Sequence, residues 1–193
     1  LQFKKGEAYS QEKIDSIRNA RLIFISGGDQ SRFMDVIAGT PIKEAIHEAF
    51  SSGSLIAGTS AGASLMSKLM VTGNEHKYPD NTGTFNSMEA NNVEMIAGLG
   101  FLESVIIDQH FIKRKRLNRL VSMCMEHPEL IGIGIDESTA IYVDGNDATV
   151  YGISQVVVIR NRSHENKIEN GLLGARNLKL DIFLPGESFF LNK

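Results

Sequence analysis

Residues 55–66 read LIAGTSAGASLM. The stretch opens as a short apolar run typical of a buried strand and ends with residues that favour a helix. Between them lies G-x-S-x-G, the pattern of a nucleophile elbow, in which small neighbours let a strained turn close and hold a serine hydroxyl clear of the sheet. Ser60 is therefore a candidate nucleophile, flanked by Gly58 and Gly62. The N–H of Ala61 would lie at a helix start, where developing negative charge is stabilised. An ordinary strand-to-helix turn fits the same five residues.

The composition indicates one globular domain. With 193 residues, 42% of them hydrophobic and 22% charged, the chain is long enough for a sizeable core, and we expect a single domain over residues 1–193. The net charge of −3 gives no general electrostatic reason to expect nucleic acid or acidic membranes as partners. Cys124 is the only cysteine, which excludes an internal disulfide and zinc sites built from several cysteines. It also fits a reducing, cytoplasmic compartment.

No apolar run approaches the roughly 20 residues that a membrane-spanning helix needs. The chain begins at Leu1 without a methionine, which fits a fragment or a processed product. A signal segment upstream of Leu1 would not be visible in this sequence, so the cytoplasmic expectation depends on cysteine usage alone.

Alternating helical and strand patterns predict an α/β fold. We expect helices at residues 10–17, 40–52, 61–66 and 112–125, and strands at 21–25, 55–57, 105–107, 131–135, 140–143, 149–151 and 156–160, with one more in the tail at 178–190. The order predicts a mostly parallel central sheet with helices on both faces, and the closely spaced later strands predict a small antiparallel extension. Residues 72–92 are polar with little periodicity, which predicts a long functional loop or lid.

The carboxyl ends of parallel strands form the edge at which ligands collect. The pair Gly27-Gly28 follows the first predicted strand at that edge, and Ser60 follows the second. A glycine pair after a strand usually marks a turn. It also brings a backbone N–H close to a ligand, because no side chain intervenes. Both features therefore point to the same edge.

A serine nucleophile needs a base at the same edge of the sheet. Of the five histidines, only His110 directly follows a predicted buried strand at its carboxyl end. The other four lie in a predicted helix, at a helix end, in the polar segment and in the tail: His47, His127, His76 and His164. A structural histidine hydrogen-bonded to nearby backbone is the alternative interpretation of His110.

The acid that orients the base has two candidates. Asp136 and Glu137 both follow the predicted strand at 131–135, and spacing alone does not choose between them. The chain order is therefore serine, histidine, acid. An α/β-hydrolase runs serine, acid, histidine, so the order argues against that fold despite the shared elbow.

Four motifs in this order resemble the serine peptidase family that contains the cyanophycinases and the α-aspartyl dipeptidases. They are Gly27-Gly28-Asp29-Gln30, Gly58-Thr59-Ser60-Ala61-Gly62-Ala63, Asp108-Gln109-His110-Phe111 with the arginines that follow it, and Gly134-Ile135-Asp136-Glu137. The resemblance covers about residues 21–160. It implies the three-layer sandwich of the class I glutamine amidotransferases. It also implies that residues 1–193 lack the family's N-terminal strand region.

The resemblance further implies roles for individual residues. Ser60 would be the nucleophile, His110 the general base and Glu137, the second of the two acid candidates, its orienting group. The N–H groups of Gly28 and Ala61 would form the oxyanion hole. More residues are implied around the substrate pocket: Gln30, Asp108, Gln109, Arg114, Arg116 and Arg119. No cofactor is implied.

Membership of such a family implies a peptide substrate. Cyanophycin has a poly-aspartate backbone with arginine amide-linked to each side-chain carboxyl, and β-aspartyl-arginine would be the product. The basic run 113–116 with Arg119 fits a carboxylate-rich substrate, because arginine binds carboxylates as a two-pronged fork. Asp108 would be available to the guanidinium group of the substrate. Basic runs are more often a solvated helix face.

Other functions fit parts of the pattern. An α-aspartyl or isoaspartyl dipeptidase of the same family would share the triad, and an inactive relative would keep the pocket. A nucleic-acid binder would use residues 113–119, although the net charge of −3 argues against it. Family members are typically dimers, so we expect a homodimer. Glu75 and His76 are neighbours without a further ligand at suitable spacing, so we expect no metal site.

Overall fold

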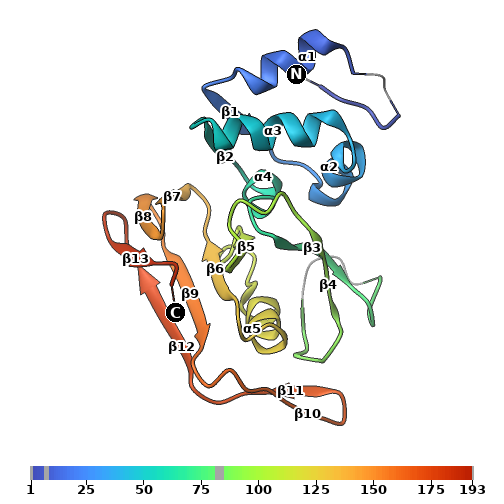
Figure 1. Cartoon of the computed structure of the whole chain (residues 1–193). Coiled ribbons are helices and arrows are strands. Elements are labelled where there is room, and N and C mark those ends of the chain that lie inside the picture. The colour runs from blue at the N-terminus through green and yellow to red at the C-terminus, as the bar shows by residue number, and fades with distance from the viewer. Residues whose placement is uncertain (1, 7–8, 81–84, 193) are drawn as a thin grey trace.

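The computed structural model describes residues 2–6, 9–80 and 85–192 and has a mixed α/β fold (Figure 1). The helices are α1 (Gln11–Arg18), α2 (Gln30–Ile37), α3 (Pro41–Ser51), α4 (Ala61–Ser64) and α5 (Leu117–Glu126). The strands are β1 (Leu22–Ile25), β2 (Leu55–Gly58), β3 (Leu69–Glu75), β4 (Val93–Ala97), β5 (Val105–Gln109), β6 (Ile131–Ile135), β7 (Thr139–Asp144), β8 (Asp147–Gly152), β9 (Val156–Asn161), β10 (Lys167–Glu169), β11 (Leu172–Gly174), β12 (Leu178–Phe183) and β13 (Ser188–Phe190).

Local sequence signals explain where the first helices begin. Ser10 and Asp29 are N-caps, and each side chain accepts a hydrogen bond from the backbone N–H three residues later. Pro41 is the first residue of α3, where a missing N–H costs no hydrogen bond. The buried face of α3 then follows helical spacing: Ile42, Ala45, Ile46 and Ala49.

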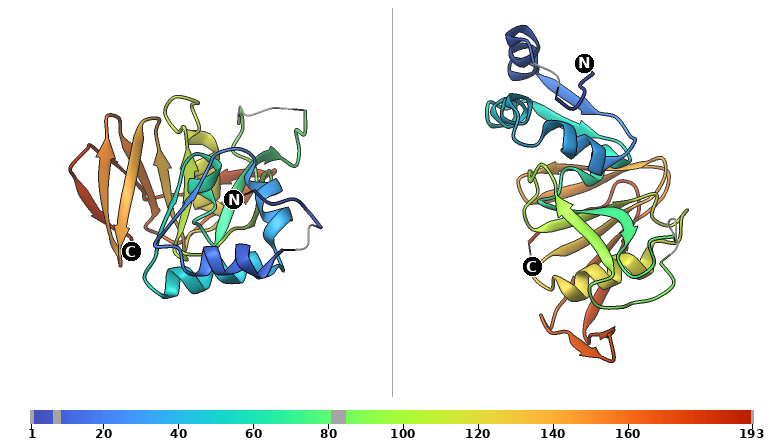
Figure 2. Two further views of the ribbon diagram at one scale, coloured as in Figure 1. Left: turned by 90° about the horizontal axis from the view of Figure 1, so that it is seen from above. Right: turned by 90° about the vertical axis from the view of Figure 1, so that its right-hand side faces the viewer.

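The parallel strands belong to two separate sheets. β1 and β2 pair in parallel at one end of the molecule, beside the packed helices α1 and α3 (Figures 1 and 2). A four-stranded sheet has the order β12-β9-β6-β5, in which β5 and β6 are parallel and β9 and β12 are antiparallel to their neighbours. The carboxyl ends of β2, β5 and β6 lead to Ser60, His110 and Glu137.

The described strands include two parallel pairs, β1–β2 and β5–β6, but the predicted mostly parallel central sheet with a three-layer layout is not confirmed, because the other strand pairs among the described residues are antiparallel. In the described part of the chain, β2 and β5 share no ladder, and α4 lies between them in contact with both. The short helix α4, which follows Ser60, therefore separates the parallel pair β1–β2 from the parallel pair β5–β6. Leu22, Phe24 and Leu55 are exposed on the β1–β2 pair.

The predicted antiparallel extension is confirmed and is larger than expected. β13, β8 and β7 form one antiparallel sheet, and β9 and β12 extend the sheet of β5 and β6. The tail contributes two strands instead of one, β12 and β13. β10 and β11 add a hairpin between β9 and β12 that the sequence pattern did not predict.

β12 is the edge strand of the four-stranded sheet. Its residues Leu180 and Ile182 pair with Ile159 and Val157 of β9, and both β9 residues face the helix α5. Leu180 and Ile182 lie on the same face, outside the area that α5 covers, and are 46% and 58% exposed. Leu184, just after β12, is 53% exposed. A row of apolar side chains therefore follows this edge.

Three helix predictions differ from the structure. α2 was not predicted, although its N-cap Asp29 and its buried Met34 and Ile37 have helical spacing. The helix after Ser60 ends at Ser64 instead of continuing to residue 66. The helix predicted at 112–125 begins only at Leu117, because turns occupy the residues directly after β5.

The segment 72–92, predicted to be one long loop, is partly a strand pair. β3 runs to Glu75 and pairs antiparallel with β4, which begins at Val93. Buried Glu75 accepts a hydrogen bond from the Asn92 side-chain amide at 2.7 Å, which fixes the two ends of the connection together. Residues 81–84 of the predicted loop, including Gly83, lie outside the described residues.

Two hydrophobic clusters form the core. The larger cluster joins the N-terminal helices to the β1–β2 pair, the four-stranded sheet and the β13-β8-β7 sheet. The smaller cluster fills the space between α5, β5 and β9. Cys124 is fully buried in the smaller cluster, where burial raises the pKa of its thiol to about 12. Cys124 is therefore a packing residue and not a nucleophile. Among the described residues, no helix has the length and apolar character needed to cross a bilayer.

Candidate active site

The elbow residue Ser60 has the strained backbone that its motif predicts. Its φ of 54° and ψ of −116° lie outside the usual regions for a side-chain-bearing residue. A Cβ at Gly58 would collide with the backbone of Gly62, and a Cβ at Gly62 would collide with the backbone oxygen of Ile25. Both glycines are therefore required for close approach of the chain segments around the turn.

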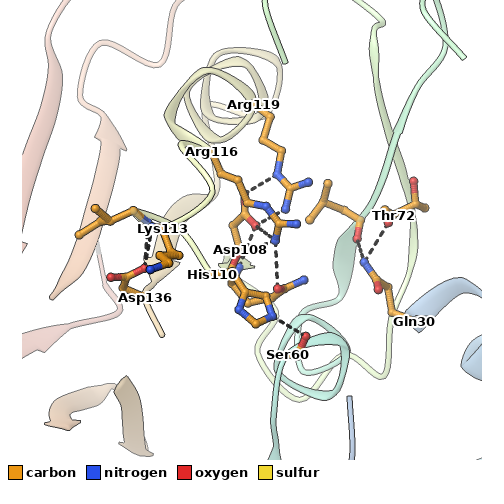
Figure 3. Close-up of polar contacts among 12 residues, drawn as sticks. Gln30, Ser60, Thr72, Asp108, His110, Lys113, Arg116, Arg119 and Asp136 are labelled. Carbon is orange, nitrogen blue, oxygen red and sulfur yellow. Dashed lines mark hydrogen bonds and ion pairs between the residues drawn. The ribbon is translucent and has the colours of Figure 1, made fainter. Parts of the chain in front are cut away.

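A chain of two hydrogen bonds joins the predicted nucleophile, base and acid. The Ser60 hydroxyl and His110 Nε2 are 2.9 Å apart (Figure 3). His110 Nδ1 lies 3.2 Å from Glu137 Oε1. In the tautomer that suits catalysis, Ser60 donates to Nε2 and Nδ1–H donates to the carboxylate. The His110 side chain is 24% exposed and that of Glu137 is 43% exposed, so the base is open to solvent and substrate.

The other acid candidate, Asp136, makes no described hydrogen bond to the imidazole ring of His110. Its carboxylate instead accepts from the N–H groups of Ile112 and Lys113, at 3.1 and 2.9 Å (Figure 3). It also accepts from the Ser154 hydroxyl at 2.8 Å. The structure thus gives the two neighbouring acids different contacts.

The glycine pair after β1 lies against the elbow. A Cβ at Gly27 would be 3.2 Å from the Cβ of Ser60, a tight contact that Ser60 would relieve by shifting a few tenths of an ångström. Gly28 has a φ of 146°, a conformation that side-chain-bearing residues rarely adopt, and has open space where a Cβ would be. Ala61 is the first residue of α4, so its N–H is one of the helix's initial amides without an intrahelical partner.

Behind His110 lies a buried cluster of charge. Asp108 has no exposed surface, and its carboxylate accepts from Arg119 Nε at 2.6 Å and from Arg119 Nη2 (Figure 3). Arg116 Nη1 lies 3.6 Å from the same carboxylate. Arg119 occupies the Asp108 carboxylate in this structure, and the sequence-based contact between Asp108 and a substrate guanidinium stays a prediction.

This cluster has more positive than negative charge. Arg116 and Arg119 are 8% and 1% exposed, and they share the single carboxylate of Asp108. Burial and the neighbouring Arg119 charge lower the pKa of Arg116 to about 10. In the described part of the chain, buried Nε of Arg116 and Nη1 of Arg119 have no hydrogen-bond partner. The cluster therefore keeps an uncompensated positive charge behind His110.

The other predicted pocket residues have contacts of different kinds. Gln30 is buried, and its amide donates to the backbone oxygens of Val71 and Thr72, at 2.8 and 3.0 Å (Figure 3). Gln109 Oε1 accepts from Arg116 Nη1 at 3.0 Å. Arg114 is exposed on the turn after β5. Gln30 and Gln109 thus hold neighbouring elements in place, while Arg114 faces solvent.

The histidines that sequence reasoning set aside lie away from Ser60. His47 of α3 packs against the Phe101 ring, and His127 ends α5 beside Glu129. His164 lines a cavity of about 230 Å³ with Arg160 and Leu130; this cavity lies at the start of β6, and Glu137 follows the opposite end of that strand. No group of metal-ligating side chains occurs among the described residues.

Sequence reasoning missed the contacts of Asp136 and the burial of Arg119. The Asp136 contacts carry no sequence signal beyond its position after a strand. The pairing of Asp108 with Arg119 has a weak sequence signal, because a charged residue inside a continuous apolar strand requires a partner of opposite charge.

A comparison with protein-family models matches residues 5–151 to the model described as Peptidase family S51. Curated relatives are cyanophycinases. The one from Trichormus variabilis is 36% identical over 176 residues, covering 88% of this chain and 56% of the relative. The one from Synechococcus elongatus is 32% identical over 195 residues, covering 97% of this chain and 58% of the relative. The chain thus spans a little over half the length of the curated relatives it matches.

Solved structures of similar fold are also peptidases. A peptidase from an acI-B1 Actinobacterium superimposes with a TM-score of 0.64 at 26% identity, covering 93% of this chain and 63% of that structure. A putative Peptidase E protein from Listeria monocytogenes superimposes with a TM-score of 0.51 at 18% identity, covering 76% of this chain and 67% of that structure. The second likeness concerns the fold alone.

Proposed function

Since this chain belongs to peptidase family S51, we propose that it is a serine exopeptidase that hydrolyses cyanophycin or a related β-aspartyl peptide. The observation that carries the proposal is the hydrogen-bonded series Ser60, His110 and Glu137. These three residues come from separate segments of the chain, and each follows the carboxyl end of a strand. An accidental contact of this kind would not explain the strained serine at one end of the series.

In the proposed reaction, His110 Nε2 takes the proton from the Ser60 hydroxyl as the serine oxygen attacks the scissile carbonyl. Glu137 holds the imidazole in the required orientation and stabilises its protonated form. The carbonyl oxygen becomes an oxyanion, for which the N–H groups of Gly28 and Ala61 are the proposed donors.

The tetrahedral intermediate then collapses. The proton on His110 passes to the leaving amine, the amide bond breaks, and Ser60 is left as an acyl-enzyme. Water, deprotonated by His110, attacks the acyl group, and the departing serine oxygen regains a proton. The dipeptide β-aspartyl-arginine is the product proposed for cyanophycin.

The excess positive charge behind His110 supports a carboxylate-bearing substrate. Arg116 Nε and Arg119 Nη1 are buried donors without a described partner, and an unpaired buried donor is costly. A substrate carboxylate close to the cluster would offset its second positive charge. Exposed Arg114 is proposed to contact the substrate from the surface, while Gln30, Asp108 and Gln109 support the pocket from behind.

The proposed quaternary structure is a homodimer, and the exposed apolar row on β12 supports it. Leu180 and Ile182 are about half exposed on an edge strand, and edge strands with exposed apolar residues tend to pair with other chains. Two copies related by a two-fold axis would bring the same edge together in antiparallel orientation.

The decisive experiment compares the wild-type chain with Ser60→Ala on cyanophycin, with product detection by mass spectrometry. We expect β-aspartyl-arginine from the wild type and a loss of at least about 1,000-fold in Ser60→Ala, with an unchanged circular dichroism spectrum. Ser52→Ala, at an exposed helix end, is the matched control and should keep full activity.

A parallel panel of β-aspartyl-arginine peptides and aspartyl dipeptides tests the substrate class. Cleavage of the dipeptides but not of cyanophycin would replace the proposed substrate and keep the mechanism. Equal hydrolysis by Ser60→Ala and the wild type would refute the mechanism itself.

A further inference from the structure

Asp136 joins three segments of the chain around the triad. Its Oδ1 accepts from two successive amides, Ile112 N–H and Lys113 N–H, in the first turn after His110. Its Oδ2 accepts from the hydroxyl of Ser154, in the connection between β8 and β9. One carboxylate thus makes three hydrogen bonds to elements far apart in the sequence.

These contacts involve the sequence neighbours of the base and of its orienting acid. Glu137 is the next residue after Asp136, and His110 precedes Ile112 by two positions. A backbone bond from Phe111 N–H to the Ile135 oxygen, at 3.2 Å, runs beside the carboxylate. Asp136 therefore connects the turn that carries the imidazole to the strand end that carries Glu137.

Neither partner of the His110–Glu137 bond is held by burial alone. Glu137 has 43% of its side chain exposed, and an exposed carboxylate keeps most of its rotamer freedom. His110 has a φ of 52°, a conformation that a side-chain-bearing residue keeps only where its surroundings impose it. The distance between His110 Nδ1 and Glu137 Oε1 therefore depends on the backbone positions of these two residues.

The Asp136 carboxylate presents one oxygen to both amides of the turn, and it stays ionised there. Burial alone would raise its pKa, but the hydrogen bonds from the Lys113 and Ile112 amides and from Ser154 outweigh it, so the pKa lies below its ordinary value. Hydrogen bonds to a charged acceptor are roughly twice as strong as neutral ones.

We propose that Asp136 is a positioning residue that sets the separation between His110 Nδ1 and Glu137 by fixing the turn after β5 to the end of β6. Its consequence for catalysis rests on the proposed function. The positional part of the inference concerns only this chain's own geometry, and it holds whatever the substrate is.

Two variants separate position from charge. Asp136→Asn removes the charge but keeps an oxygen where Ile112 and Lys113 need an acceptor. Asp136→Glu keeps the charge but moves the oxygens by one methylene. Ser154→Ala is the matched control, since it removes one hydrogen bond to Asp136 and leaves both bonds to the turn.

The first readout is the low-field proton NMR signal of the His110 Nδ1–H bonded to Glu137, assigned by its loss in His110→Gln. We expect the signal in the wild type, Asp136→Asn and Ser154→Ala, and its loss in Asp136→Glu. An unchanged signal in Asp136→Glu, or loss in Asp136→Asn with retention in Asp136→Glu, would overturn the inference. This measurement needs no substrate.

The second readout is the rate at which a fluorophosphonate probe labels Ser60. Misplacement of a base by about 1 Å can cost about 100-fold, so we expect labelling of Asp136→Glu to be about 10- to 100-fold slower, and that of Asp136→Asn to stay within a few-fold of wild type. In a Glu137→Gln background, Asp136→Glu should cause no further loss, because it acts through that carboxylate. Multiplicative losses would contradict it.

The two readouts also separate this inference from the proposed function. A wild-type chain that shows the NMR signal but does not react with the probe would refute the peptidase proposal and leave the role of Asp136 decided by the NMR comparison alone.

Discussion

Ser60 stores strain at the point where chemistry is proposed. A side-chain-bearing residue in its conformation costs about 1–3 kcal/mol, which the surrounding packing must offset. The glycines on either side make this possible, because they let β1, β2 and α4 approach more closely than any other residue would allow. The requirement for glycine is therefore steric and can be tested apart from activity.

Gly62→Ala should lower the free energy of unfolding by about 2 kcal/mol or more, because the new methyl group would collide with the backbone oxygen of Ile25. Urea unfolding followed by circular dichroism measures the change. Gly174→Ala is the control: its nearest neighbours would be 3.8 Å away, and its stability should stay within about 0.5 kcal/mol of wild type. Similar values for both variants would contradict the steric explanation.

His47 should make stability depend on pH. Burial, with the nearby Lys43 charge, lowers the pKa of its imidazole, so below pH 6.5 the unfolded chain binds a proton that the folded chain takes up only at lower pH. Its contribution to stability is therefore complete above pH 6.5 and is lost as the pH falls through the folded pKa. Melting temperatures between pH 7.5 and 5 should fall less in His47→Gln than in the wild type.

His127→Gln is the control for this effect, since His127 is a partly exposed helix-end residue beside Glu129. Its melting temperatures should fall with pH as steeply as those of the wild type. If the melting temperature of His47→Gln falls with pH as steeply as that of the wild type, groups other than His47 cause the pH dependence of stability.

Single residues were predictable where position alone fixes their role. Ser60 and His110 come just after the carboxyl ends of β2 and β5, and the carboxyl ends of parallel strands are where ligands collect. Spacing could not separate Glu137 from Asp136, because both follow the same strand and their partners come from other segments. Only the three-dimensional contacts give one acid to the imidazole and the other to the turn.

At the level of elements, β5 and α5 are joined by a buried ion pair. Asp108 lies in a fully buried strand, and Arg119 reaches it from the first turns of α5. Arg119 also stacks over the ring of Phe85, with the guanidinium 5.4 Å from the ring centre. The pair thus fixes α5 against the strand that carries His110.

Arg119→Met should destabilise the fold by about 3 kcal/mol, because it leaves the Asp108 carboxylate buried with only the more distant Arg116. The double variant Arg119→Met with Asp108→Leu should recover part of that loss, since no buried charge is left unpaired. Arg114→Met, on an exposed side chain, should have little effect. Urea midpoints measure all three, and an additive double variant would exclude the coupling.

The elements that sequence reasoning missed depend on non-local contacts. β3 and β4 consist partly of polar residues without clear alternation and form because they pair with each other. α2 is amphipathic but only eight residues long, and its packing against α3 and α4 stabilises what local propensity alone would not. By contrast, the apolar strands β5 and β6 were evident from composition alone.

For the whole molecule, the proposed dimer has a preferred register along β12. Antiparallel pairing of two β12 strands centred on Leu180 places Lys179 of each copy opposite Asp181 of the other, Leu180 opposite itself and Ile182 opposite Leu178. Centring on Lys179 or Asp181 would oppose like charges. Charge therefore favours the register centred on Leu180.

Leu180→Cys should cross-link into a covalent dimer under mild oxidation, because the two cysteines would lie directly opposite each other. Ile182→Cys is the control: the corresponding cysteines would be four residues apart along the strands and should not cross-link. Non-reducing electrophoresis and light scattering measure the outcome. A monomeric wild type, or equal cross-linking of both variants, would reject this interface.

The broad α/β character and the parallel pairs were predictable from sequence, and the break between the two sheets was not. Apolar runs report that a strand is buried but not which strand lies beside it. Here α4 occupies the position between β2 and β5, so the strands that deliver Ser60 and His110 do not pair with each other.

This break would make the proposed activity sensitive to a contact region that carries no backbone ladder. Ser60 is attached to the N-terminal unit of β1 and β2, while His110 and Glu137 are attached to β5 and β6. A shift of roughly 1 Å between the units would slow the proposed hydrolysis by about 100-fold while each unit kept its secondary structure. On gentle heating, turnover should therefore disappear before the circular dichroism signal does, and a molecule that clamps this contact region would act as an activator.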